Sequence, residues 1–301
     1  MASCPSAVAR SASRRAILGF FLLLTSPAGA QSYDFRLEKL HNPHEGATDY
    51  SPLANANFQS FARRVGAAMA SANLSPPETL GHTGFSMTAE LSVVDFRGGP
   101  ALPTADDFRG PLLMPSFHVR KGLPWSFELG ARGAWIEKSR MGVATIELKW
   151  ALNEGYAFLP DVGVRAHIGK LINARNLDLV AGGLDLGIGK RFAIAGMVTL
   201  TPYAGWNLVF VGASTGNVDF NPQATLAEAD VSRDAQFKDL YVFNPLGPAA
   251  NSHSRFYGGF RFVAGVLQLG AEVSYSILGK APDGVTDQAV IGWNSTLGLQ
   301  F

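Results

Sequence analysis

Apolar and polar residues alternate along most of the chain after Gly84. Between Gly142 and Trp150, every second residue is apolar, and the residues between them include Glu147 and Lys149. A repeat of two places all the apolar side chains on one face, which predicts a β-strand with one apolar and one polar face. Ten segments have this pattern: Phe85–Val93, Leu113–Lys121, Trp125–Ile136, Gly142–Trp150, Val162–Ile168, Val180–Gly189, Val198–Phe210, Phe256–Phe262, Leu267–Ile277 and Ala289–Phe301.

The connections between these segments differ in length in a regular way. The long connections 96–110, 212–253 and 278–288 all fall on one side of an up-and-down sheet, and the tight connections 122–124, 190–196 and 264–266 fall on the other. Bacterial membrane barrels have an even number of strands, short periplasmic turns and long extracellular loops. Two connections fit less well, because 153–160 is long for a periplasmic turn and 138–141 is short for an outer loop.

The tenth segment runs to Phe301, and Trp293, Leu297 and Leu299 share its apolar face. It resembles the C-terminal strand of bacterial outer-membrane β-barrel proteins, in which a terminal Phe closes the sorting signal. The resemblance implies recognition by the barrel assembly machinery, a place in the outer membrane and lipid against the apolar face. We therefore expect an all-β fold, an antiparallel up-and-down transmembrane barrel of about 10 strands, with 12 as the alternative. A soluble barrel or sandwich would produce the same alternation.

A different repeat precedes the strands. Apolar residues recur there at spacings of three and four, which predicts an amphipathic helix from Pro52 to Asn73, ended by Pro76 and Pro77. We expect this helix to block the barrel from the periplasmic side, with its two arginines pairing with lumen carboxylates. The alternative is a helix lying on the membrane surface. The residues of this candidate plug are Phe58, Phe61, Arg63, Arg64 and Val65.

Residues 1–30 have the features of a secretory signal peptide. They carry three arginines and no acid, a short apolar run from Ala16 to Leu24, and small residues at Ala28 and Ala30. The run is too short to span a bilayer, although a retained anchor is the alternative. The sequence thus divides into a signal peptide (1–30), a helical or irregular segment that can serve as a plug (31–81) and a transmembrane barrel (82–301).

Composition narrows the chemistry. Cys4 is the only cysteine, so the mature chain would contain no disulfide and no thiolate metal site. Cleavage after Ala30 leaves 22 basic and 24 acidic residues with no basic block, which gives nucleic-acid binding no electrostatic support. The chain is 47% hydrophobic and 16% charged, and its apolar residues are dispersed by alternation, as in a membrane barrel.

The polar faces of the strands carry charges of both signs. Such residues either pair across a closed lumen or contact a polar solute, because isolated charges away from water are costly. The lumen-lining candidates are Glu90, His118, Arg120, Glu128, Arg132, Glu147, Lys149, Arg165, His167, Asp185, Tyr203, Arg261 and Glu272.

Catalytic and metal-binding patterns are weak. The string 212–216 matches a nucleophile elbow, but no helix pattern follows it. Ser252-His253-Ser254 lies at the outer rim, where membrane-embedded lipid hydrolases place a His and a Ser, but the spacing differs from the His-x-Ser of those families. A proline separates His41 from His44, which prevents a helical two-His site. We therefore expect no enzyme activity, no cofactor and no metal.

Three functions fit this sequence. The first is passage or binding of a small solute, gated by the helix and the long outer loop. The second is a non-conducting surface barrel with an adhesive or structural role, and the third is a lipid-modifying enzyme. A lumen clear of side chains favours the first, and a filled lumen favours the second. The expected partners are outer-membrane lipid, the assembly machinery and a small solute. The long loop supplies an apolar surface, formed by Phe237, Leu240, Tyr241 and Phe243, that should fold onto the barrel mouth or bind an external partner.

Overall fold

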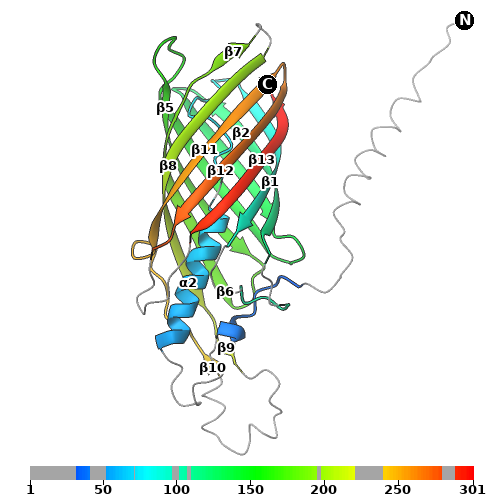
Figure 1. Ribbon diagram of the computed structural model, residues 1–301, viewed down its shortest axis with the longest axis vertical. Coiled ribbons are helices and arrows are strands. Elements are labelled where there is room, and N and C mark those ends of the chain that lie inside the picture. Colours follow the sequence, from blue (N-terminus) through cyan, green and yellow to red (C-terminus); the bar gives the residue numbers. More distant parts are fainter. Residues whose placement is uncertain are drawn as a thin grey trace, which may run out of the picture. The chain divides into compact units, whose positions relative to one another are not determined.

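The computed structural model describes residues 32–40, 52–70, 72–96, 102–106, 110–194, 198–220, 240–279 and 289–301. The predicted signal peptide and its cleavage site lie outside these residues. Ten long strands form one antiparallel sheet that closes into a barrel, because β8 pairs with both β6 and β11 (Figure 1). The strands of the barrel are β1 (Phe85–Asp95), β2 (Leu112–Leu123), β3 (Phe127–Trp135), β4 (Gly142–Asn153), β5 (Asp161–Ile172), β6 (Leu177–Gly189), β8 (Val198–Thr215), β11 (Ser252–Ala264), β12 (Leu267–Ile277) and β13 (Val290–Gln300).

All ten predicted strands are present, and the sequence prediction of an all-β barrel of ten strands is confirmed. Two short additions were not predicted: β7 (Phe192–Ile194) pairs with the start of β8, and β9 (Val218–Asp219) pairs with β10 (Leu240–Tyr241) in the long loop. The third strand begins later than predicted. Trp125 and Ser126 have φ angles of 60° and 58°, so they belong to the turn before β3.

The two faces of the barrel wall differ sharply in polarity. Leu148, Leu186 and Phe260 point outward and are 45%, 48% and 46% exposed. Their neighbours Glu147 and Asp185 point inward and are buried. Closure leaves no unpaired strand edge, and an apolar exterior around a polar interior is what a lipid bilayer requires of a barrel.

The two ends of the barrel are distinguished by their connections. At the long-loop end, residues 96–111, 216–251 and 278–289 join consecutive strands. At the short-turn end, β2 and β3 are joined by residues 124–126, and β11 and β12 by residues 265–266. Short turns face the periplasm in bacterial outer-membrane barrels, which makes the short-turn end the expected periplasmic side.

Helix α2 (Pro52–Met69) lies at the long-loop end, beside β9 and β10 (Figure 1). Phe58 stacks on Phe243 of the long loop with ring centroids 4.7 Å apart, and Asn55 donates to the hydroxyl of Tyr241. The short 3₁₀ helix η1 (Leu37–Leu40) follows Phe35, whose ring contacts Phe61. We call α2, η1, β9, β10 and residues 242–251 the cap. The expected folding of the loop aromatics onto the barrel mouth is present at Tyr241 and Phe243, whereas Phe237 lies outside the described residues.

The prediction that the helix enters from the periplasmic side is therefore wrong. The apolar face of α2 packs against strand ends at the long-loop end, including Val94 of β1, Leu179 of β6 and Val290 of β13. A helix that precedes β1 can lie at either end of the barrel, because the chain that connects them can pass through the lumen. Here, the last turn of α2 lies inside the barrel, and the segment between α2 and β1 continues through the lumen to the short-turn end.

Candidate functional site: the threaded lumen

Residues 73–80 pass through the barrel interior in contact with its wall, and we call them the threaded segment. They follow the C-terminal end of α2 and precede β1, which begins at the opposite end of the barrel. Leu74, five residues after the end of α2, has a φ angle of 46°, so the chain changes direction there. Pro76 and Pro77 then hold it out of a helix, because proline lacks an N–H and disfavours a helical conformation in the preceding residue.

Three arginines of the wall hold the chain where α2 ends. Arg132 and Arg165 donate to the carbonyl of Ala72 at 2.8 and 3.3 Å, and Arg255 donates to that of Ala70 at 2.7 Å. The last carbonyls of a helix lack helical partners and carry its partial negative charge. The barrel thus places cations where the end of the helix attracts them.

Glu272 of β12 accepts the next two backbone N–H groups. Its carboxylate oxygens lie 3.1 Å from the nitrogen of Asn73 and 2.8 Å from that of Leu74. The hydroxyl of Tyr203 donates to the same carboxylate at 3.1 Å, and the amide of Asn73 donates to Tyr257 at 3.2 Å. Hydrogen bonds to a buried charged group are among the stronger ones in proteins.

Lys149 and Glu128 continue this set of contacts. The ammonium of Lys149 donates to the hydroxyl of Ser75 and to the carbonyl of Glu78 at 2.8 and 3.0 Å. It also lies 3.0 Å from Glu128, which in turn accepts the N–H of Leu80. Both members of this ion pair therefore bind backbone groups of the threaded segment: the lysine donates to a carbonyl, and the glutamate accepts an N–H.

The last contacts lie near the short-turn end. Glu78 is clamped between Arg261, which hydrogen-bonds it, and Arg191, whose Nε lies 3.1 Å from its other oxygen. Thr79 donates its N–H and its hydroxyl to Glu154. With these bonds, every residue from Asn73 to Leu80 except Pro77 is tied to the wall by a hydrogen bond or ion pair.

Pro77 instead packs closely against glycines of the wall. A Cβ added to Gly163 would lie 2.8 Å from the Pro77 carbonyl oxygen, and one added to Gly189 would lie 2.9 Å from Pro77 Cδ. At Gly187 the same atom would lie 3.8 Å from Pro77 Cβ. Glycine allows this close approach of another chain, so β5 and β6 have room for the threaded segment where larger side chains would exclude it.

The remaining charges of the lumen pair with one another. Glu90 lies 2.8 Å from Arg132 and 3.0 Å from His118, and His118 lies 3.0 Å from Glu147. Arg165 then joins Glu147 to Asp185, at 2.8 Å from each. Since these groups are buried, each pair offsets a desolvation cost that neither charge could bear alone.

The structure places all thirteen lumen-lining candidates in the barrel interior. It brings most of them into the network that runs from Glu90 to Asp185, which His167 reaches through Asn207. Arg120 joins the pair of Glu128 and Lys149. Arg63 and Arg64 do not reach the expected carboxylates, which pair with wall arginines, His118 and the threaded segment. Arg64 instead lies over the ring of Phe96 in the cap region.

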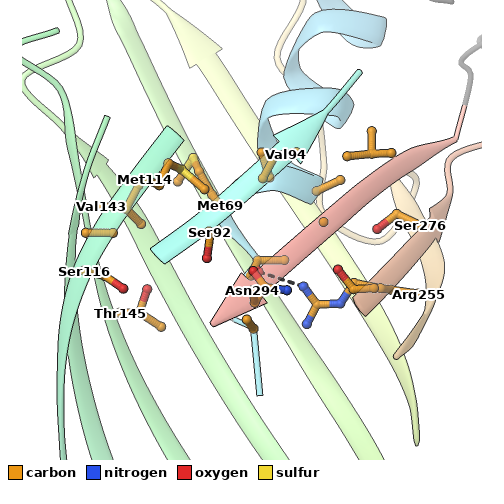
Figure 2. Close-up of a pocket in the computed structure, with 18 of the residues that line it drawn as sticks. Met69, Ser92, Val94, Met114, Ser116, Val143, Thr145, Arg255, Ser276 and Asn294 are labelled. Atoms are coloured by element: carbon orange, nitrogen blue, oxygen red, sulfur yellow. Dashed lines mark hydrogen bonds between the residues drawn. The ribbon is translucent and has the colours of Figure 1, made fainter. Parts of the chain in front are cut away.

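Two cavities flank the threaded segment. A cavity of about 30 Å³ lies beside the C-terminal end of α2, lined by Met69, Ser92, Arg255 and Asn294 among others; Figure 2 shows this group. It has room for only about two or three waters, at roughly 10–15 Å³ each. A second cavity of about 460 Å³ lies near the short-turn end and is lined by Glu78, Glu154, Arg191 and Arg261. We call this second cavity the vestibule.

The sequence did not indicate several of the residues that hold the threaded segment. Ser75 and Glu78 fall within the segment predicted to be helical or irregular (31–81), and Arg191 falls within a predicted tight connection (190–196). The one available signal was the glycine content of the polar faces of β5 and β6, where Gly163, Gly187 and Gly189 take the place of larger inward side chains.

The candidate hydrolase motif is not assembled. His253 points inward and is buried, whereas Ser252 and Ser254 fall on the opposite face of β11. Neither ring nitrogen of His253 has a hydrogen-bond partner among the described residues. Within the same residues, no group of three His, Cys, Asp or Glu is arranged to hold a metal ion, and no helix is long and apolar enough to cross a membrane. His41 and His44 lie outside the described residues.

Several solved structures are similar to this chain. The N-terminal β-barrel domain of Pseudomonas aeruginosa OprF is 8% identical, with 73% of this chain and 99% of that one covered and a TM-score of 0.33. Ail, the attachment invasion locus protein of Yersinia pestis, is 12% identical over 73% and 99%, with a TM-score of 0.28. The outer membrane enzyme PagL is 7% identical over 70% and 97%, with a TM-score of 0.31. At such low identities and TM-scores, these similarities do not indicate a function.

No protein-family model and no curated protein sequence matches the chain. The assignment therefore rests on the structure itself. Its ten antiparallel strands close without an edge, and its wall is apolar outside and charged inside. The chain folds as a closed ten-stranded β-barrel of the membrane-spanning type, with an apolar exterior and a charged interior.

Proposed function

We propose that the protein is a non-conducting outer-membrane barrel, sealed by its own N-terminal segment, that works by binding or by a structural role at its capped end. One observation carries this proposal. The lumen groups that could contact a solute are already bound to the threaded segment or to one another. Arg132 and Arg165 hold Ala72, Glu272 holds Asn73 and Leu74, and Lys149 holds Ser75.

The energy of opening supports the same conclusion. Withdrawal of the segment would leave buried donors and acceptors without partners, each at a cost of about 1–3 kcal/mol unless water replaces the lost bond. Several such groups lie along the lumen, so an open state would be rarely populated. A closed barrel acts through its surface. At the long-loop end, the cap forms that surface.

Gated passage of a small solute is the second candidate, and the vestibule favours it. Its volume of about 460 Å³ is within the range of ligand pockets, roughly 300–1,000 Å³. Its lining includes two arginines and two glutamates, so a polar solute would enter from the short-turn end and stop at the Glu78 clamp. We assign no catalytic step to the chain under either candidate.

Single-channel conductance in planar bilayers tests the proposal. The mature protein should show no channel steps, and a variant lacking residues 31–80 should conduct, with heat-modifiable migration on gels as the control for an assembled barrel. Conductance of the intact protein equal to that of the deletion variant would contradict the sealed barrel. Voltage- or solute-dependent openings of the intact protein would favour gated passage instead.

A further inference from the structure

We propose that the barrel carries its own N-terminal region across the outer membrane, so that residues 32–40 and the first turns of α2 stand on the outer side of the cell. The proposal goes beyond the sealed lumen, because a plug inserted from the periplasm would seal the barrel equally well. What distinguishes the two is the side on which the chain before the plug lies.

Contacts at both ends of the threaded segment fix its direction. Before it, the N–H of Arg36 donates to the carbonyl of Pro103, in the connection between β1 and β2 at the long-loop end. After it, Lys121 donates to the carbonyl of Thr83, and the N–H of Phe85 donates to that of Phe301, both at the short-turn end. The chain therefore enters the lumen at the long-loop end and leaves it at the short-turn end.

The length of the segment is sufficient for a complete crossing. An extended chain advances by about 3.3 Å per residue, so the stretch from Asn73 to Thr83 reaches roughly 36 Å. The apolar band of a bacterial barrel is about 25 Å tall. The segment therefore has enough reach to complete the crossing, because the last turn of α2 already lies inside the barrel, beside Ser92, Thr145 and Asn294 of the wall.

The lumen is built to receive an extended polypeptide. Pro76 and Pro77 have no N–H groups, so the wall need not offer acceptors there, and glycines of β5 and β6 allow the close approach. Elsewhere the wall binds mainly backbone groups, with Glu272 accepting two N–H groups and Lys149 donating to two carbonyls. Contacts to backbone groups bind an extended chain whatever its side chains are. The cargo of this barrel is therefore its own N-terminal region, displayed on the outer surface as part of the cap.

Two cysteine variants test this directly, since a mature chain without residues 1–30 contains no cysteine. Arg36→Cys places a thiol before the threaded segment, at a side chain that is 48% exposed. His82→Cys places one after it, at an exposed position. Intact cells are treated with a membrane-impermeant maleimide, and the same cells are then treated after permeabilisation of the outer membrane. Labelling of the denatured protein gives the total amount of reactive cysteine in each variant.

The proposal predicts that Arg36→Cys is labelled in intact cells and that His82→Cys is labelled only after permeabilisation. Labelling of both only after permeabilisation would place the N-terminal region in the periplasm and overturn the proposal, as would the reversed pattern or labelling of both in intact cells. These outcomes are independent of conductance. A non-conducting barrel with a periplasmic Arg36 would retain the sealed lumen and reject only the crossing.

Discussion

Replacement of Glu272 by Gln tests whether the wall holds the threaded segment. The carboxylate accepts the N–H groups of Asn73 and Leu74 through different oxygens. Glutamine keeps the shape but offers one oxygen, so its amide nitrogen faces one of the two N–H groups and leaves that donor unpaired. An unpaired buried donor costs about 1–3 kcal/mol, which raises the population of a released segment by about 5- to 150-fold.

The assay measures how fast a maleimide labels a cysteine placed inside the barrel, next to the threaded segment. Ala72→Cys lines the small cavity beside the end of α2, where a thiol is protected while the segment is in place. When opening and closing are fast relative to labelling, the rate follows the open population. Adding Glu272→Gln to Ala72→Cys should therefore raise the labelling rate in liposomes by about 5- to 150-fold.

Thr201→Val is the matched control. Thr201 is fully buried in the lumen, its hydroxyl has no partner among the described residues, and valine preserves its shape. It should leave the labelling rate unchanged. A rate for the Glu272→Gln variant equal to that of the control, in a barrel that still shows heat-modifiable migration, would refute the claim that this carboxylate secures the segment.

The remaining predictions concern the wall, the glycines and the sorting signal. Leu148→Arg, on the lipid face, should lower the free energy of unfolding in bilayers by about 2–4 kcal/mol, and an unchanged urea titration would show that this face does not meet lipid. Gly163→Leu should displace Pro77 and produce channel steps, whereas Gly133→Leu, where an added Cβ meets nothing within 4 Å, should not. Deletion of Phe301 should reduce the amount of barrel in outer-membrane fractions, and normal assembly without it would argue against a terminal sorting signal.

The barrel could be predicted from the sequence because its signal is local. Each strand shows the repeat of two in its own residues, so the inward position of Glu147 and the outward position of Leu148 follow without knowledge of any neighbour. Strand number and loop asymmetry then follow by counting. This is why the predicted segments and the observed strands agree closely.

The threaded segment could not be predicted, because its role depends on partners far away in the chain. Glu272 lies about 200 positions after Asn73, and nothing local marks either residue as a partner of the other. The pair Pro76 and Pro77 ends a helix in any context, so it indicated only where the helix stops. The side of the barrel on which α2 lies also depends on the path of the connecting chain, which the apolar repeat of the helix does not encode.

The most direct test of the central claim is a disulfide between the threaded segment and the wall. A Cβ at Gly187 would lie 3.8 Å from that of Pro77, which is about the mean Cβ–Cβ separation in disulfides. In the double variant Pro77→Cys, Gly187→Cys, oxidation should give a cross-linked barrel with altered migration on non-reducing gels. The pair Pro77→Cys, Gly292→Cys should give none, since the atoms nearest to a Cβ at Gly292 belong to Ser274 and Asn294. An assembled barrel in which the first pair fails to cross-link under oxidising conditions would contradict a segment threaded along β6.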